Sequence, residues 1–190
     1  MSAPYVLRSA RYLAAEVMER VVRPGDTVID ATVGNGHDTC ALARLVGAEG
    51  HVIGFDIQPK ALESTEKLLR EQALWERVTL HGDGHEHLAE HVPGAVRFVC
   101  FNLGWLPGGD KSVTTHWHST EMALRQALSL LLPGGVCTVC AYPGHAAGRE
   151  ELTELERLLA ALRPQEYNVL EQCFVNAGEN APVCFVIQRQ

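Results

Sequence analysis

Short runs of β-branched residues alternate with longer segments of helical period along most of this chain. The runs predict strands at residues 27–30, 51–56, 78–81, 97–101 and 136–141. The segments around them predict helices at residues 10–22, 38–45, 59–72, 85–91, 120–132 and 149–162. Such alternation is typical of a mostly parallel sheet with helices on its faces. It therefore predicts an α/β fold of the doubly wound, Rossmann-like kind.

The end of the chain does not follow this alternation of strands and helices. Two strand-like runs, at residues 167–174 and 183–188, are separated by residues 176–182 with no helix between them, which predicts an antiparallel hairpin. A mostly parallel seven-stranded sheet with a C-terminal antiparallel hairpin is the layout of class I methyltransferases, whereas dehydrogenase domains usually add another parallel crossover. By fold analogy, the hairpin favours the first class.

Length and composition limit the number of domains, the cellular location and the possible partners. At 190 residues and 46% hydrophobic content, the chain suits one well-packed domain over residues 1–190. No segment approaches the roughly 20 apolar residues of a membrane-spanning helix, so we expect a cytoplasmic protein with no membrane association. The net charge of -7 argues against coating of nucleic acid by the whole surface, but a local basic face can still hold a tRNA arm.

The six cysteines are expected to be buried free thiols. Cys137 and Cys140 form a CxxC pattern on a predicted strand, which points residues three apart to opposite faces. We therefore expect neither a disulfide nor a metal site there.

A glycine-containing loop, Asp30-Ala-Thr-Val-Gly-Asn-Gly-His-Asp-Thr39, follows the first predicted strand and opens a helix. Gly34 and Gly36 allow the backbone to turn sharply and approach a ligand. A dinucleotide fingerprint would need a third glycine where Thr39 stands, to bring a pyrophosphate onto the helix. S-adenosylmethionine (SAM) carries no phosphate, so the spacing favours SAM.

Three acidic residues stand at the ends of three successive predicted strands: Asp30, Asp56 and Asp83. Open α/β sheets bind ligands at that edge. Asp56 can accept both ribose hydroxyls of a nucleoside, and Asp83 with His85 follows the third strand, where methyltransferases usually contact adenine. Each acid taken alone could equally be a helix cap or part of a solvated turn.

The segment at residues 101–111 follows the fourth predicted strand, beside the place where the methyl group of SAM would emerge. Amino-group methylases often carry Asn or Asp there, followed by an aromatic residue, and Asn102 with Trp105 resembles that arrangement. A carboxamide oxygen can accept an amine N–H and aim the nitrogen lone pair at the methyl group. An alkyl ammonium must first lose a proton, which Asp110 or His145 could accept.

The neighbouring residues have two interpretations each. Trp105 could stack on a flipped base or be a core or lid residue. Lys111 could contact a phosphate or simply be solvated. The segment from Tyr142 to His145 follows the fifth strand at the same edge, or forms only a tight turn.

Taken together, the segments at residues 30–39, 55–58, 84–86, 101–111 and 142–145 resemble the MnmM (YtqB-like) methyltransferases, long labelled "putative rRNA methylases". The resemblance spans nearly the whole chain. It implies SAM-dependent methylation of the aminomethyl group of 5-aminomethyl-2-thiouridine at the wobble position, in the anticodon arm of tRNA. The chain departs from the family pattern at Trp105, where Tyr is usual, and at Gly84, where Ser is usual.

The site residues predicted from the residues and the resemblance fall into three groups. The cofactor contacts are Asp30, Gly34, Asn35, Gly36, Asp38, Thr39, Asp56, Ile57, Gln58, Asp83, Gly84, His85 and Asn102. The substrate contacts are Leu103, Gly104, Trp105, Pro107, Gly108, Gly109, Lys111 and Tyr142. The catalytic residues are Asn102, Asp110 and His145.

Three alternatives and the oligomeric state stay open. The same chemistry could act on ribosomal RNA or on a small amine, which the acidic net charge permits. An NAD-dependent oxidoreductase is opposed by Thr39 and by the terminal hairpin. A SAM-binding module without catalysis is opposed by Asn102 and its glycine-rich neighbours. A homodimer is compatible with the sequence.

Overall fold

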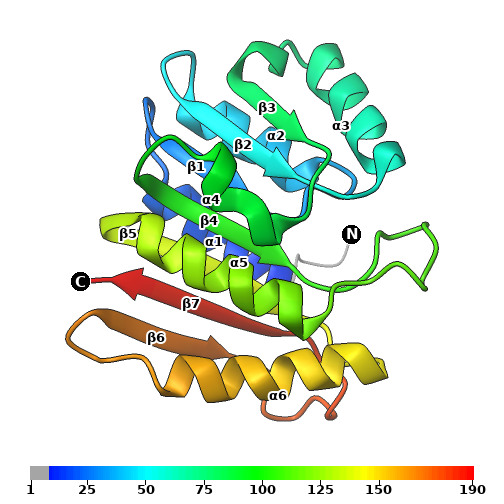
Figure 1. Cartoon of the computed structure of the whole chain (residues 1–190), viewed down its shortest axis with the longest axis vertical. Coiled ribbons are helices and arrows are strands. Elements are labelled where there is room, and N and C mark those ends of the chain that lie inside the picture. The colour runs from blue at the N-terminus through cyan, green and yellow to red at the C-terminus, as the bar shows by residue number, and fades with distance from the viewer. Residues whose placement is uncertain (1–8) are drawn as a thin grey trace, which may run out of the picture.

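The structure, a computed structural model, describes residues 9–190 and contains one mixed sheet with helices on both faces (Figure 1). The strands are β1 (Thr27–Asp30), β2 (His51–Phe55), β3 (Val78–His81), β4 (Val96–Asn102), β5 (Leu131–Ala141), β6 (Tyr167–Gln172) and β7 (Val183–Arg189). The helices are α1 (Ala10–Val21), α2 (His37–Val46), α3 (Pro59–Glu71), α4 (Leu88–His91), α5 (Trp117–Leu130) and α6 (Ala146–Ala160), with 3-10 turns η1 (Trp75–Arg77) and η2 (His85–His87).

The sheet has seven strands in the order β3-β2-β1-β4-β5-β7-β6. Strands β1 to β5 pair in parallel, whereas β7 is antiparallel to both β5 and β6. The predicted fold class, with its C-terminal antiparallel hairpin, is confirmed. The strand order reverses between β1 and β4, and open α/β sheets bind ligands at such a point.

Two apolar cores cover the two faces of the sheet. Helices α1, α2 and α3 contribute Met18, Leu42 and Leu69 to one core, and helices α4, α5 and α6 contribute Leu88, Leu124 and Leu155 to the other. Burial on both faces is why the central strands read as continuous apolar runs rather than alternating ones.

Five of the six cysteines are buried as predicted, but Cys173, which was also predicted to be buried, is exposed just after β6. Cys137 packs into the core under α5 and α6, whereas Cys140 belongs to a cluster with Ala10 and Ala14 of α1, so the two thiols lie on opposite faces as predicted. All six cysteines are free thiols.

Some predicted boundaries were wrong. The helix expected at residues 120–132 begins at Trp117 and ends at Leu130, because Leu131 already pairs with Val96 in the sheet. Pro133 disfavours helical conformation in the residue before it, and this ends the helix early. The helix expected at residues 85–91 is a 3-10 turn followed by one short helical turn.

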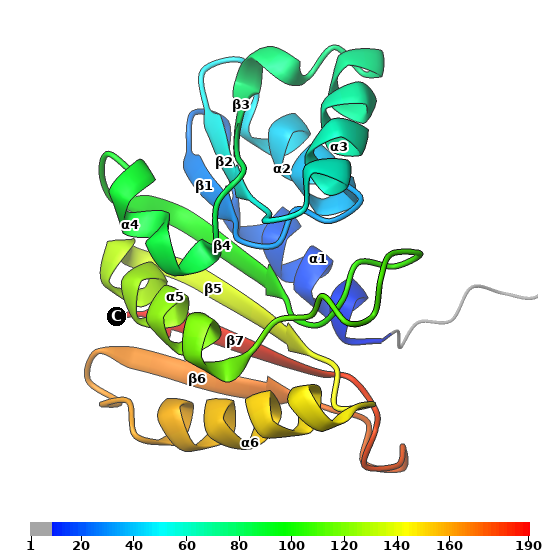
Figure 2. The ribbon, with the colours of Figure 1, turned by 45° about the vertical axis from the view of Figure 1, so that its right-hand side comes forward.

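The segment between β4 and α5 projects from the sheet edge beside the start of α1 (Figure 2). It is the longest connection at the carboxyl ends of the parallel strands. This segment and the loops after β1, β2, β3 and β5 surround the site described next. Within residues 9–190, no helix has the length and apolar character needed to cross a membrane.

Candidate active site

A cavity of about 580 Å³ opens at the carboxyl ends of the parallel strands. Its volume is within the usual range for small-molecule sites. The wall is built from the loops after β1 to β5, with Arg11 of α1, His37 and Asp38 of α2, and Ser119 of α5 added. Most predicted cofactor and substrate residues line it: Gly34, Asn35, Asp38, Asp56, Ile57, Gln58, Asp83, Gly84, His85, Asn102, Leu103, Gly104, Trp105, Pro107 and Tyr142.

The loop after β1 is shaped by its two glycines. Gly34 and Gly36 have φ values of 53° and 76°, a region that other residues rarely adopt. A Cβ at Gly36 would come within 2.5 Å of the Thr65 hydroxyl oxygen on α3. Gly36 therefore allows close packing of the loop on α3 and does not itself line the cavity.

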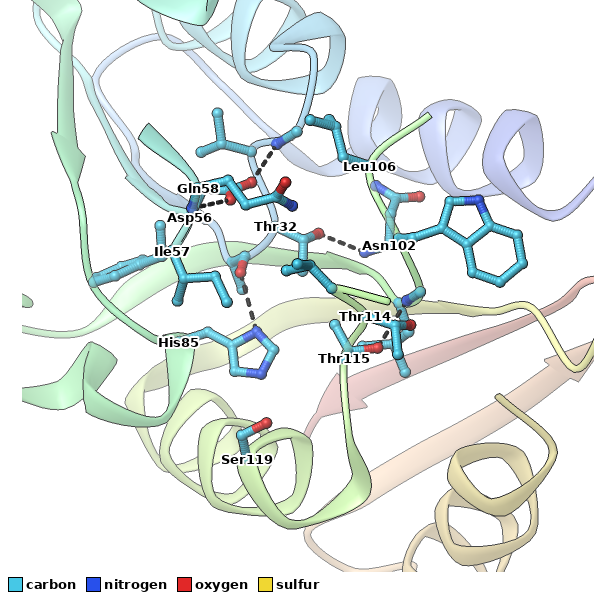
Figure 3. Close-up of a pocket in the computed structure, with 18 of the residues that line it drawn as sticks. Thr32, Asp56, Ile57, Gln58, His85, Asn102, Leu106, Thr114, Thr115 and Ser119 are labelled. Atoms are coloured by element: carbon cyan, nitrogen blue, oxygen red, sulfur yellow. Dashed lines mark hydrogen bonds between the residues drawn. The ribbon is translucent and has the colours of Figure 1, made fainter. Parts of the chain in front are cut away.

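Asp56 connects the loop after β1 to the end of β2. Its Oδ2 accepts the Gly34 N–H at 2.8 Å, and its Oδ1 accepts the Gln58 N–H at 2.9 Å (Figure 3). A carboxylate has further lone pairs, so these backbone bonds leave acceptor capacity for a ligand. Asp56 thus both shapes the loop and faces the cavity.

Asp30 and Thr39 do not line the cavity, contrary to their predicted role as cofactor contacts. Asp30 is fully buried and accepts hydrogen bonds from the Thr39 hydroxyl at 2.6 Å and the Thr32 N–H at 3.2 Å. Burial, with a further contribution from the neighbouring Asp38, raises the pKa of Asp30 to about 7. The pair supports the loop from beneath, because the first turn of α2 directs the Thr39 side chain toward Asp30.

On the side of β3, His85 and Ile57 line the cavity (Figure 3). His85 Nδ1 lies 3.2 Å from the Ala31 carbonyl oxygen, so Nδ1 carries the hydrogen. Burial lowers the pKa of His85, which keeps the ring neutral with Nε2 as an acceptor. Ile57 is 61% exposed, unusual for a large apolar side chain, and offers a flat ligand an apolar surface.

Asp83 also faces the cavity, but its carboxylate is already engaged. It accepts hydrogen bonds from His87 Nδ1 and His91 Nε2, each at 2.9 Å, and from the Gly84 N–H at 2.8 Å. The hydrogen bonds from the two histidines hold the pKa of Asp83 well below its usual range. Its predicted contact with a cofactor remains a prediction.

Asn102, at the end of β4, has a side chain held in one orientation. Its Nδ2 donates to Asp38 Oδ2 at 2.8 Å, and its backbone N–H donates to the Thr32 hydroxyl at 2.7 Å. An ionised carboxylate can only accept, so the amide nitrogen must face Asp38. The amide oxygen Oδ1 is buried and has no hydrogen-bond partner among the described residues. Arg11 Nε lies 3.6 Å from the other Asp38 oxygen.

The segment from Leu103 to His116 forms a loop over the cavity. Its neck is closed by two hydrogen bonds between Gly104 and Thr115 and by a single antiparallel bridge between Trp105 and Thr114. Beyond the neck, the Pro107 carbonyl accepts from Asn35 Nδ2 at 3.3 Å. The loop therefore contacts the glycine-containing loop across the cavity.

The tip of this loop lies away from the cavity wall. Gly108, Gly109, Asp110 and Lys111, all predicted site residues, do not line the cavity. Asp110 is exposed, and hydrogen bonds from the Ser112 N–H and hydroxyl lower the pKa of its carboxyl group. Lys111 Nζ lies 5.3 Å from the centre of the Trp105 ring. The predicted role of Asp110 as a proton acceptor therefore remains a prediction.

His145 is positioned by the start of α6. Its Nδ1 accepts the Gly148 N–H at 3.2 Å, so the neutral ring carries its hydrogen on Nε2. Burial first, then the charges of Arg149 and His116, lower the pKa of His145. The ring lies 4.5 Å from that of Trp105. His145 can donate from Nε2, which argues against its predicted role as a proton acceptor.

Several wall residues were not predicted from the sequence: Arg11, Thr32, His37, Thr114, Thr115 and Ser119. Thr32 lies inside the glycine-containing loop, and that position was a usable signal. Arg11 comes from α1, before the first strand, and so lies outside the strand-end loops from which the site was predicted. Within residues 9–190, no group of three or more His, Cys, Asp or Glu side chains could hold a metal ion.

A reversed strand order with a terminal antiparallel β7, and a cavity at the carboxyl ends of the parallel strands, define the class of Rossmann-like methyltransferases. Comparison with known proteins agrees. The family model described as "Putative rRNA methylase" matches residues 52–188, and the model of protein-L-isoaspartate(D-aspartate) O-methyltransferases matches residues 2–101. The chain belongs to the family of the first model, which covers most of it.

Individual relatives extend over nearly the whole chain. A chloroplastic tRNA (mnm(5)s(2)U34)-methyltransferase of Arabidopsis thaliana is 39% identical over 96% of this chain and 70% of its own length. The crystal structure of a "putative rRNA-methylase" from Clostridium thermocellum has 38% identity and a TM-score of 0.95, covering 98% of this chain and 100% of that one. A "putative methyltransferase" from Streptococcus mutans, in complex with SAH, has 27% identity and a TM-score of 0.88 over 97% of this chain and 100% of its own.

Proposed function

We propose that this protein transfers a methyl group from SAM to the amino nitrogen of 5-aminomethyl-2-thiouridine at the tRNA wobble position. The product is 5-methylaminomethyl-2-thiouridine. The observation that carries the proposal is the buried Oδ1 of Asn102 on the cavity wall, which has no partner in the part of the chain that the structure describes and is held in place by Asp38. The Arabidopsis relative, a tRNA (mnm(5)s(2)U34)-methyltransferase similar over 96% of this chain, supports the choice of substrate.

The cavity residues fit a sulfonium nucleoside. Asp56 offers carboxylate acceptors to a ribose, neutral His85 offers an acceptor to an exocyclic amine, and Ile57 offers an apolar surface to a base. The glycine-containing loop lets the backbone approach without a side chain in the way. When bound, SAM supplies a methyl group activated by the positive charge on its sulfur.

The rest of the reaction is mainly alignment. An amine nitrogen attacks the methyl carbon with its lone pair while the carbon–sulfur bond breaks and S-adenosylhomocysteine leaves, so the amine must approach unprotonated and correctly aimed. The nitrogen then releases one proton to water. Asn102 Oδ1 accepts one N–H of the amine and fixes that direction. The carboxylate of Asp38 attracts the substrate while it is still an ammonium ion and raises its local concentration.

The modified base is held by the loop over the cavity. Trp105 offers a ring on which a flipped base can stack, a contact worth about 1–3 kcal/mol. His145 Nε2–H offers a donor to a base carbonyl. Arg11 and Lys111 lie on this side of the molecule and can meet phosphates of the anticodon arm.

The test is methylation of defined tRNAs in vitro. The purified protein is incubated with SAM and with tRNA that carries either 5-aminomethyl-2-thiouridine or unmodified uridine at the wobble position. Nucleoside mass spectrometry should show methylaminomethyl product only with the first. Methylation of ribosomal RNA or of a free small amine, with none of tRNA, would favour the alternative substrates.

Binding of NAD without SAM in calorimetry would favour an oxidoreductase, which the antiparallel β7 opposes.

The proposal also covers the domain organisation, the cellular location and the oligomeric state of the protein. We propose that residues 1–190 form one methyltransferase domain, that the protein works in the cytoplasm where tRNA is available, and that it can act as a homodimer. Sedimentation velocity of the purified protein measures the oligomeric state, and a fluorescent fusion reports the location.

A further inference from the structure

Glu151 is a buried carboxylate outside the cavity wall. It lies in α6, and only 1% of its surface is exposed. Burying an ionised group is costly unless hydrogen bonds compensate it. Both carboxylate oxygens of Glu151 accept hydrogen bonds from hydroxyl groups of the segment that leads from the loop over the cavity into α5.

Thr115 links Glu151 to the loop over the cavity. The Gly104 N–H donates to the Thr115 hydroxyl oxygen at 2.7 Å, and the same hydroxyl donates to Glu151 Oε2 at 2.7 Å (Figure 3 shows Thr115 at the foot of this loop). A hydroxyl has one hydrogen, so its donation to Glu151 leaves the oxygen lone pairs for the Gly104 N–H. Hydrogen bonds in such a chain polarise one another.

Gly104 and Thr115 are the two ends of the loop that carries Trp105. The Thr115 N–H also donates back to the Gly104 carbonyl oxygen at 3.1 Å, which closes the neck. Gly104 has a φ of 114°, and a Cβ placed there would meet no atom of the described residues within 4 Å. The backbone at this end of the neck is therefore little restrained by packing, and its hydrogen bonds determine its position.

Thr120 holds the second oxygen of Glu151 and provides a matched comparison. Its hydroxyl donates to Glu151 Oε1 at 2.6 Å from within α5. Thr120 is as buried as Glu151 but does not line the cavity or contact the loop neck through its hydroxyl. The two threonine hydroxyls thus donate the same kind of hydrogen bond to one carboxylate. Only the Thr115 hydroxyl also accepts a hydrogen bond from the loop neck.

We propose that Glu151 is a positioning residue for the substrate: through the Thr115 hydroxyl it fixes the neck of the loop at residues 104–115 and so places Trp105 over the cavity. This inference rests on the proposed function, because the loop is the element expected to hold the modified base. It assigns a role in substrate binding to a side chain that touches neither substrate nor cofactor.

The experiment compares Thr115→Val with Thr120→Val in the full-length protein. Both variants remove one hydroxyl from Glu151, so both should lower the melting temperature. Thr115→Val should raise KM for the tRNA about tenfold, because it also frees the Gly104 N–H, while the dissociation constant for SAM changes less than about twofold. Thr120→Val should change KM for the tRNA by less than about threefold.

Two further variants sharpen the test. Thr115→Ser restores the hydroxyl and should return KM to within about twofold of the starting protein. Glu151→Gln keeps one acceptor oxygen but presents an amide nitrogen to the other hydroxyl, so KM should rise. Glu151→Gln combined with Thr115→Val should be no worse than Thr115→Val alone, since both break the same chain of hydrogen bonds.

A readout without catalysis separates this inference from the proposed function. With Trp75→Phe and Trp117→Phe, Trp105 is the only tryptophan left, and acrylamide quenching reports its exposure. Quenching should increase in Thr115→Val and not in Thr120→Val. Equal changes in the two valine variants, or none in either, would overturn the role of Glu151. If quenching increases only in Thr115→Val but the starting protein does not methylate tRNA, the proposed substrate would be overturned instead.

Discussion

The side-chain nitrogen of Asn102 donates a hydrogen bond to the carboxylate of Asp38 at 2.8 Å, across 64 positions of sequence. This bond decides which end of the Asn102 amide faces Asp38, because an ionised carboxylate cannot donate. The amide oxygen is left as an acceptor without a partner within residues 9–190. A buried acceptor in that state costs roughly 1–3 kcal/mol, which a donor from the substrate would recover.

Replacing Asn102 by alanine removes the acceptor and tests its role. Turnover should fall by a factor on the order of 100 or more, while SAM affinity stays near that of the starting protein, as expected from loss of nucleophile alignment. Steady-state kinetics and calorimetry measure the two quantities. Ser129→Ala, at an exposed position of α5 outside the cavity wall, is the control and should change neither. Near-normal turnover in Asn102→Ala would mean that the amine is oriented by another group.

Asp38→Asn tests the orientation of the Asn102 amide. An asparagine at 38 can donate as well as accept, so the Asn102 amide loses its single preferred orientation. Turnover should fall about tenfold, less than in Asn102→Ala, and the double variant should resemble Asn102→Ala because the two side chains act as one unit. Additive losses in the double variant would show that Asp38 acts independently of Asn102.

Asp56→Ala should weaken SAM binding. The substitution removes the acceptors of the Gly34 and Gln58 N–H groups as well as the expected ribose contact. The dissociation constant for SAM should rise by about tenfold or more, and turnover at saturating SAM should change less. Glu63→Ala, on the exposed face of α3, serves as the control in the same calorimetric titrations. Unchanged affinity in Asp56→Ala would place the nucleoside elsewhere in the cavity.

His145→Asn separates proton acceptance from hydrogen-bond donation. Asparagine can replace Nδ1 as the acceptor at the start of α6, so the fold should be kept. Because the pKa of His145 is lowered, the ring is already neutral at pH 7 and titrates below its ordinary value of about 6.5. The pH–rate profile between about pH 7 and 9 should therefore rise with the same slope in both proteins. Loss of that rise in His145→Asn would identify His145 as the proton acceptor.

Asp30→Asn should stabilise the protein at alkaline pH. The folded-state pKa of about 7 lies above the unfolded value, so the folded state binds the extra proton and loses stability as pH rises between about 4 and 7. Asparagine cannot ionise and avoids this loss. Its gain in free energy of unfolding at pH 8 should exceed its gain at pH 5 by on the order of 2 kcal/mol, measured by urea unfolding. A gain that does not depend on pH would contradict the raised pKa.

Much of the fold could be predicted because its signals are local. The alternation of apolar strands and amphipathic helices, the missing helix before residues 183–188, and the glycines at 34 and 36 each depend on neighbouring residues. Strand ends in an open α/β sheet meet at one edge, so Asp56, His85 and Asn102 could be placed in one site. Boundaries such as the start of β5 were missed because a strand pairing competed with helical periodicity.

The sequence by itself determined the class of fold, the edge of the sheet that holds the site, and most of the residues on the cavity wall. Only the tertiary structure decided what each polar group does there: the burial of Asp30 with Thr39, the orientation of the Asn102 amide, the hydrogen on His145 Nε2, and the link from Glu151 to the loop neck. The physical reason is that backbone pattern follows from neighbours along the chain, whereas hydrogen-bond partners and burial are set by groups that folding brings together from distant positions.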